Sequence, residues 1–122
     1  MATVQIRPGG QFIKNLDLYA GDSYTSPAYT VKEGDTTIDA EDYTWKILVE
    51  DAISGADFVT LTSGSGITFP SGKFQWSLSA AQTAAMTPER SYRYDIQFTR
   101  PDGTVKTIQR GNIIAHIDIT PA

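Results

Sequence analysis

The chain has 122 residues, 40% hydrophobic and 20% charged, which is the composition of one folded domain and not of a disordered segment. A net charge of −4 argues against a general nucleic-acid binder, and the absence of cysteine excludes disulfides, thiolate metal sites and cysteine nucleophiles. The first residues show no basic segment followed by an apolar core, and no apolar run approaches a membrane-spanning length. We therefore expect synthesis in the cytoplasm and no membrane partner.

The N-terminal segment 1–10 is expected to form an arm or an edge strand. Thr3, Val4 and Ile6 belong to a short β-prone run, which a Pro-Gly-Gly turn ends. A terminal strand of this kind often lies at a sheet edge or crosses to a neighbouring chain, so these three residues are candidate partner contacts. Residues 11–122 are expected to fold as a single domain.

The next part of the chain predicts one strand, then an irregular loop. The run from Gln11 to Tyr19 places its large apolar residues on one parity, which is typical of a strand with one buried face. Residues 24–42 are irregular and acidic, with one short strand expected around residues 28–32.

The centre of the chain predicts four short strands, at residues 44–49, 58–62, 67–69 and 74–78. The first carries Trp45, Ile47 and Val49 on one face, and Ser-Gly and Pro-Ser-Gly clusters separate the others.

One segment, near residues 79–87, predicts a short helix. Ser79 and Gln82 have the spacing of a capping box, alanines follow, and Pro88 ends the run. Because two turns of helix are too short to be stable alone, we expect Met86 or the alanine before it to face the core.

The C-terminal stretch from Arg90 to Thr120 predicts a three-stranded antiparallel meander. Apolar residues recur at every second position, Pro101-Asp102-Gly103 supplies a hairpin turn, and Gly111 lies between the second and third runs. Several short strands with regular turns predict an all-β fold, an antiparallel β-sandwich of about eight strands with the one short helix. The core candidates are Trp45, Trp76, Tyr94, Phe98 and Ile117.

No motif predicts catalysis, so we do not expect an enzyme, a cofactor or a metal. His116 is the only histidine, and its parity places it outward on a strand, where it has few partners for a metal or a triad. The acids between Glu33 and Asp42 do not match the spacing of a calcium loop and more simply form a solvated loop.

Two surface features suggest binding. Tyr24 and Tyr29, in a loop rich in Ser, Thr and Pro, would form a sugar-stacking platform or a partner anchor, unless both rings fold back over the sandwich. The outward cations of the meander form a basic side that is either a docking surface or ordinary solvated charge, and they are Arg93, Arg100, Lys106 and Arg110.

Charge is also divided unevenly along the chain. Through Asp57 there are ten acids and four bases, and from Phe58 onward four acids and six bases. A domain with one acidic and one basic face can stack head to tail or dock on unlike subunits, although the asymmetry can equally be accidental.

Two passages of the sequence resemble a known family when taken together. The first is residues 38–46, an acidic turn that leads into a Trp-bearing strand; the second is Trp76 to Thr83, followed by Tyr92 to Ile96, Asp102-Gly103, Thr107, Gly111 and Asp118-Ile119-Thr120. In this order they resemble small phage structural proteins, in particular the N-terminal domain of siphophage upper baseplate proteins.

The resemblance covers Ile38 to Thr120 and implies an immunoglobulin-like β-sandwich that attaches a module to the virion, with no catalytic residues. Upper baseplate proteins continue into helical parts that anchor receptor-binding proteins. Those parts have no counterpart in this sequence, so their delivery function is not carried over.

The expected function is therefore that of a non-enzymatic virion structural protein. It would attach or reinforce tail, baseplate, fibre or head components, with other virion proteins and further copies of itself as partners and no nucleic acid. The protein would move from the cytoplasm into the virion. The alternative is a carbohydrate-binding module that uses Tyr24, Tyr29 and the acidic loop.

Overall fold

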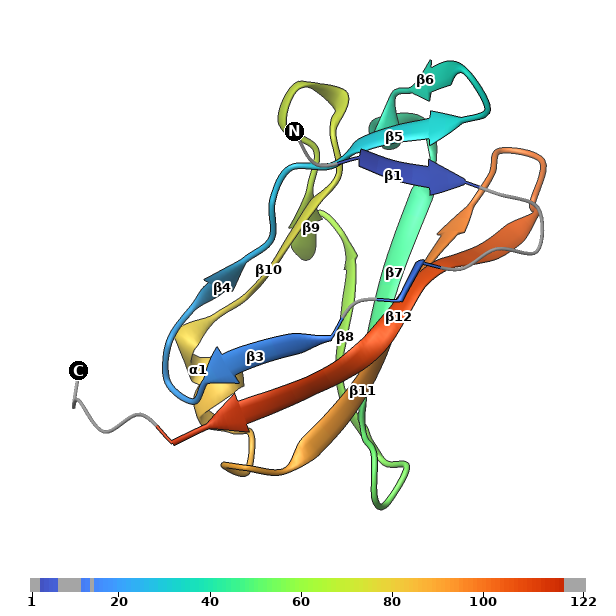
Figure 1. Cartoon of the computed structure of the whole chain (residues 1–122). Helices are drawn as coiled ribbons and strands as arrows, with labels where there is room; N and C mark the ends of the chain where they lie inside the picture. The colour runs from blue at the N-terminus through green and yellow to red at the C-terminus, as the bar shows by residue number, and fades with distance from the viewer. Residues whose placement is uncertain (1–2, 7–11, 14, 118–122) are drawn as a thin grey trace.

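The computed structural model describes residues 3–6, 12–13 and 15–117, with side chains described from Asn15 onward (Figure 1). Short strands make up most of it. Within those residues the strands are β1 (Thr3–Ile6), β2 (Phe12–Ile13), β3 (Leu16–Tyr19), β4 (Tyr24–Thr25), β5 (Thr30–Glu33), β6 (Thr36–Ile38), β7 (Thr44–Asp51), β8 (Asp57–Ser63), β9 (Gly66–Thr68), β10 (Gln75–Leu78), β11 (Ser91–Thr99) and β12 (Val105–His116). The helices are the 3-10 turns η1 (Ala40–Asp42) and η2 (Pro70–Gly72) and the α-helix α1 (Ala80–Ala84). No helix among the described residues has the length and apolar character needed to cross a membrane.

The strands form a sandwich of two layers. In one layer β12, β11, β7 and β8 pair antiparallel in that order, and β2 and β3 pair parallel with β12. Strands β9, β10 and β4 continue the path beyond β8, and their side chains pack against the first layer: the ring centroids of Trp76 on β10 and Tyr94 on β11 are 5.7 Å apart. Because the chain's early strand β3 joins its last strand β12 beside β11 and β7, the sandwich is immunoglobulin-like, as expected.

The core follows from strict alternation along the long strands. On β11 every second residue is buried, starting at Tyr92, and on β7 the buried positions are Trp45, Ile47 and Val49, as the sequence predicts. Trp45 stacks on Phe74 with a centroid distance of 4.3 Å, and it lies 5.5 Å from the ring of Phe98. These rings join the two layers into one continuous core.

The predicted meander is a two-stranded hairpin. Strand β12 runs unbroken from Val105 to His116 through Gly111, whose φ is not positive, so this glycine does not form a turn. A shift in register at Ile96/Gln97 absorbs an extra residue on β12 instead, and this bulge buries both Ile108 and Gln109. Two consecutive buried residues break the period of two within β12. The sequence pattern therefore predicted two separate strands where the structure has one.

The core candidate Ile117 is also wrong. Ile117 is 57% exposed and lies just past the end of β12, outside the paired part of the sheet. The other four candidates are buried. Ile119, which continues the same parity, lies outside the described residues.

The short helix is confirmed with its capping box. The Ser79 hydroxyl accepts a hydrogen bond from the Gln82 amide (3.1 Å), while the Gln82 side chain accepts one from the Ser79 amide (2.8 Å). Met86, just beyond α1, is 1% exposed and closes this end of the core.

A separate three-stranded sheet, β1-β5-β6, covers the other end of the sandwich (Figure 1). β1 lies at its edge and pairs parallel with β5, from Thr3↔Thr30 to Ile6↔Glu33. The sequence predicted β5 two residues too early and did not predict β6. The Glu33 carboxylate ties this sheet to the hairpin, since it pairs with Arg100 and accepts a hydrogen bond from the Tyr43 hydroxyl (3.3 Å).

Candidate partner-binding surface

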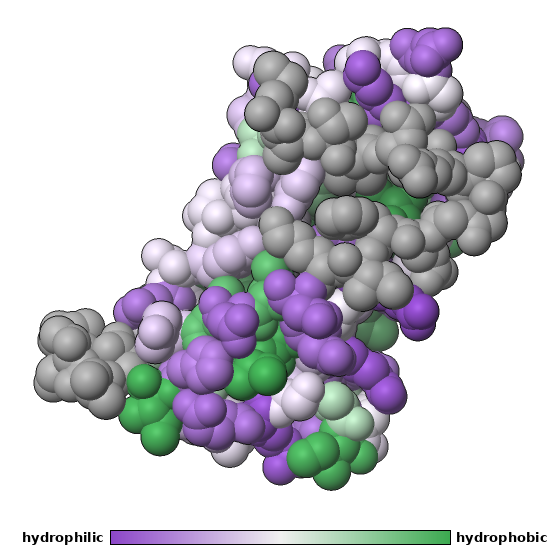
Figure 2. All heavy atoms as spheres, in the orientation of Figure 1, coloured by the Kyte–Doolittle hydropathy of each residue, from purple (hydrophilic) through white to green (hydrophobic). Residues whose placement is uncertain are grey.

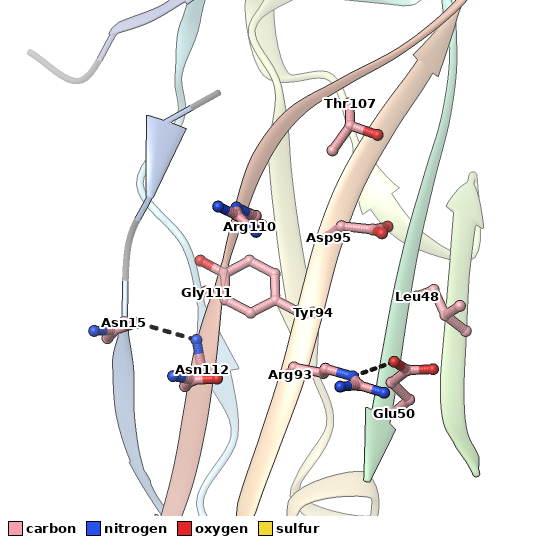
Figure 3. Close-up of a pocket in the computed structure, with 10 residues that line it drawn as sticks. All are labelled: Asn15, Leu48, Glu50, Arg93, Tyr94, Asp95, Thr107, Arg110, Gly111 and Asn112. Atoms are coloured by element: carbon pink, nitrogen blue, oxygen red, sulfur yellow. Dashed lines mark hydrogen bonds and ion pairs between the residues drawn. The ribbon is translucent and has the colours of Figure 1, made fainter. Parts of the chain in front are cut away.

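The outer face of the first layer carries a hollow of about 610 Å³. Its lining comes from adjacent strands and the residue that precedes β3, and Figure 3 shows how the side chains lie around it. The lining residues are Asn15, Leu48, Glu50, Arg93, Tyr94, Asp95, Thr107, Arg110, Gly111 and Asn112. A hollow of this size is within the range of ligand sites, although its wall is more polar than that of a typical small-molecule pocket.

Cross-strand register fixes the charges around this hollow. Asp95 on β11 lies opposite Leu48 on β7 and opposite Arg110 on β12, so these three form one row across the face. The next row contains Glu50 and Arg93, which face each other and form an ion pair.

A hydrogen bond closes the β3 side of the hollow. The Asn15 side-chain oxygen accepts it from the Asn112 backbone amide (3.1 Å), which fixes the chain just before β3 against β12. Gly111 lies opposite Tyr94 and has no side chain, so no side chain of β12 fills the hollow at this position.

The environment of Asp95 in the hollow disfavours its charged form. Partial burial raises its pKa above 3.8, the neighbouring charge of Glu50 raises it further, and the charge of Lys46 opposes both. No hydrogen bond or ion pair joins the side chain of Asp95 or of Arg110 to another described residue.

The predicted basic side of the hairpin is not a continuous cationic surface. Arg93 is paired with Glu50, and Arg100 is paired with Glu33 and lies 5.3 Å from the centroid of the Phe98 ring. Lys106 is not free of interactions either. The antiparallel register brings acids of the first half of the chain next to these cations, which leaves Arg110 as the predicted cation that enters the hollow without a counter-ion in the described residues.

The predicted tyrosine platform is wrong for Tyr29 and is not an exposed platform at Tyr24. Tyr29 is only 5% exposed and belongs to the core. Tyr24 is half-buried, its ring lies 5.2 Å from that of Trp76, and burial raises its pKa to about 12, with smaller effects from Tyr29 and Tyr94. Both rings fold onto the sandwich, which is the other reading that the sequence left open.

The acidic loop does not form a metal site in the described residues. Asp39 instead caps η1 through the Glu41 amide, and Glu33 is used by Arg100 and Tyr43. The side chains of Thr3, Val4 and Ile6 lie outside what the structure describes, although their backbone forms β1.

His116 faces outward, as predicted, and lies between two acids. Its Nε2 is 2.9 Å from an Asp17 oxygen, and its Nδ1 is 3.2 Å from a Glu89 oxygen. Because the two carboxylates approach opposite sides of the ring, the three groups do not converge on one metal ion. Hydrogen bonding to Asp17 is the main reason that the pKa of His116 is raised above 6.5; Glu89 adds to it and partial burial opposes it.

The exposed large hydrophobic side chains of residues 15–117 do not gather into one patch. Ile53 lies in the β7–β8 turn, Val105 begins β12, and Tyr19 and Ile117 lie at the ends of β3 and β12. On the face shown in Figure 2, hydrophobic groups are interspersed with hydrophilic ones. Scattered exposed apolar residues are normal for a folded domain, so the charged hollow is the better candidate for a binding surface.

Sequence reasoning missed most of the hollow. Asp95, Glu50 and Asn112 were not singled out, although the same outward parity that selected Arg93 and Arg110 would have included Asp95 and Asn112. Glu50 and Asn15 had no such signal, because only strand order brings them to this face.

No family model and no curated protein matches the chain. Among solved structures it is similar to the fibronectin(III)-like modules of CbhA from Clostridium thermocellum (10% identity, 96% of this chain and 98% of that chain, TM-score 0.43). Others are murine CRIg (10% identity, 87% and 92% coverage, TM-score 0.38) and the V domain of amphioxus IgVJ-C2 (14%, 83% and 99%, TM-score 0.31). Nothing in them indicates a phage baseplate protein. The strand pairing described above therefore carries the conclusion that the chain is an immunoglobulin-like β-sandwich.

Proposed function

We propose that this protein is a non-enzymatic virion structural protein that attaches or reinforces components of a phage particle through protein–protein contacts. The observation that carries the binding role is the hollow on the outer sheet face, with two charged residues, Asp95 and Arg110, that form no ion pair with a described residue. Charged groups held on rigid strands favour recognition of a complementary protein surface. The assignment to a virion rests on the resemblance of residues 38–46 and of the segments from Trp76 onward.

Repetition in a particle would strengthen such contacts. A surface with a few charged anchors binds weakly when alone, whereas many copies in a symmetric assembly act together. Edge strand β1 offers a second route to attachment, since the β1–β5 pairing can in principle be supplied by another copy of the chain.

The carbohydrate-binding alternative loses its proposed platform. A sugar-stacking site needs exposed aromatic faces, but Tyr29 is buried and Tyr24 packs against Trp76. A glycan array with and without calcium tests this alternative, and specific binding would favour it over the structural role.

Mass spectrometry of purified particles tests the proposed function. The protein is expected at a fixed stoichiometry relative to the major structural proteins, and crosslinks are expected from it to neighbouring virion chains. Its absence from particles purified to constant composition, while it is present in the same lysate, would contradict the proposal.

A further inference from the structure

The two charges of the outer-face hollow are neighbours that do not neutralise each other. Asp95 and Arg110 are directly opposed on adjacent antiparallel strands, a position in which Cβ atoms are usually about 5 Å apart. No ion pair joins them. In Figure 3 the Asp95 carboxyl points toward β7 while the Arg110 side chain lies over β12, so a space remains between them.

The surroundings of Asp95 favour a cation from outside. This carboxylate is partly buried beside Leu48, with Glu50 as an acidic neighbour. Glu50 already has Arg93 as its ion-pair partner, whereas Asp95 feels the charge of Lys46 but forms no ion pair with any described residue. A partly desolvated carboxylate without a partner gains more from an added basic group than an exposed one does.

Arg110, on the β12 side of the hollow, favours an anion from outside. Its guanidinium has no carboxylate partner in the described residues and can receive one in a bidentate manner. Thr107, Asn112 and Asn15 lie along the rim and offer hydroxyl and amide groups that suit a polypeptide backbone.

We propose that this hollow binds an extended segment of a partner polypeptide that carries a basic and an acidic side chain two positions apart. Residues i and i+2 of a strand point to the same side and lie about 6.6 Å apart, which suits two anchors on neighbouring strands. The basic side chain pairs with Asp95, and the acidic side chain pairs with Arg110. This inference rests on the proposed function, because it specifies the chemistry of the partner that the function requires.

Titration of the whole protein with short peptides, followed by amide NMR shifts, tests the inference. The probes are acetylated and amidated Gly-Arg-Thr-Glu-Gly and its reverse, Gly-Glu-Thr-Arg-Gly, with Gln versions of each that lack one charge. One order is expected to bind and to shift the amides around Leu48, Asp95 and Arg110. Each Gln version is expected to bind about fivefold more weakly, as is the charged peptide to the variants Asp95→Asn and Arg110→Gln.

Matched variants at sites outside the hollow control for net charge. Asp35→Asn, in the β5–β6 turn, and Lys73→Gln, beside η2, are expected to leave peptide affinity unchanged. No shift with either peptide, or equal binding of the charged and Gln peptides, would overturn the inference. The proposed function would still stand if the protein is found in particles, because that experiment does not depend on the hollow.

Discussion

His116 acts at the residue scale as a clamp between three parts of the chain. It belongs to β12, Asp17 belongs to β3, and Glu89 lies in the turn before β11 with a φ of 63°. Glu89 is held from both sides, since its amide donates to the Ala115 carbonyl (2.6 Å) and its carboxylate accepts from the Ile117 amide (3.1 Å). With an acid at each ring nitrogen, the doubly protonated imidazolium is the form that satisfies both contacts.

The clamp predicts that stability depends on pH. The pKa of His116 is raised in the folded protein, so its contribution to stability is fully present below the unfolded value of 6.5 and is lost as pH rises through the folded value. The gap in unfolding free energy between wild type and His116→Gln should be larger at about pH 6 than at about pH 8. Denaturant unfolding at the two pH values measures this gap.

NMR titration of the imidazole supplies the control. Asp17→Asn should lower the pKa of His116, and Asp22→Asn, a nearby exposed acid outside the clamp, should leave it unchanged. A gap that is constant between the two pH values would show that the clamp does not contribute in this way.

The Ser26 side chain takes the place of a backbone hydrogen-bond acceptor in the segment that joins β4 to β5. Its hydroxyl accepts a hydrogen bond from the buried Trp76 amide (3.0 Å), and its own amide donates to the Trp76 carbonyl (2.8 Å). The side chain thereby supplies a ladder bond next to Pro27, which has no amide proton to donate.

The variant Ser26→Ala is expected to destabilise the domain by about 1–3 kcal/mol, because it leaves the Trp76 amide buried without an acceptor. Urea unfolding followed by tryptophan fluorescence measures the loss. Ser77→Ala, on the same strand pair, is the matched control and should change stability by less than about 0.5 kcal/mol, because the Ser77 hydroxyl has no hydrogen-bond partner among the described residues. Equal losses in the two variants would refute the role of Ser26.

At the scale of the elements, the turn between β8 and β9 contains two glycines with positive φ that differ in their surroundings. Gly64 has a φ of 83° and Gly66 a φ of 90°, so both have the left-handed conformation that disfavours a side chain. A Cβ at Gly66 would lie 2.6 Å from Leu61 Cδ2 and 3.3 Å from Leu61 Cβ, whereas a Cβ at Gly64 would meet nothing within 4 Å.

Gly66→Ala should therefore cost more stability than Gly64→Ala. Both variants lose about 1–2 kcal/mol to backbone strain, and Gly66→Ala loses a further ~1–3 kcal/mol because Leu61 must shift within the core. Parallel thermal unfolding of the two variants compares them directly. If Gly64→Ala proved equally destabilised, the contact with Leu61 would not be the cause.

Elements with a clear local signal were predictable. Trp45, Ile47 and Val49 mark β7 by alternation, and Ser79 with Gln82 marks the start of α1 by reciprocal hydrogen bonds. β6 escaped prediction because its residues are exposed or half-buried and show no apolar period. The bulge in β12 escaped because its cause, the register with β11, is not local to the strand.

At the scale of the whole molecule, the uneven charge of the chain is partly neutralised within the fold. Four of the five ion pairs among the described residues join an acid of the first half to a base of the second: Asp51–Arg90, Glu50–Arg93, Glu33–Arg100 and Asp17–His116. Strand pairing brings these four early acids next to basic groups of the second half, so this part of the charge does not separate into opposite faces. Head-to-tail stacking by charge loses its main support.

Deletion of residues 1–10 tests the attachment role of the N-terminal segment. The deletion removes β1 from the edge of the small sheet and keeps every member of the core cluster found among the described side chains, which begin at Asn15. We expect a cooperative fold with an unchanged near-UV circular dichroism spectrum and weaker incorporation into particles. Quantitative mass spectrometry of the particles measures incorporation, and an unchanged amount of the truncated protein would remove the segment from the proposed attachment.

The sequence by itself determined the parts of this protein that depend on near neighbours along the chain. Alternation determined which faces of β7 and β11 are buried, Pro101-Asp102-Gly103 determined the β11–β12 hairpin, and together they predicted a β-sandwich. Only the tertiary structure decided which outward residues meet. Asp95 and Arg110 lie side by side without pairing, while Arg93 and Arg100 find their acids, because register and strand order set those distances and sequence spacing does not.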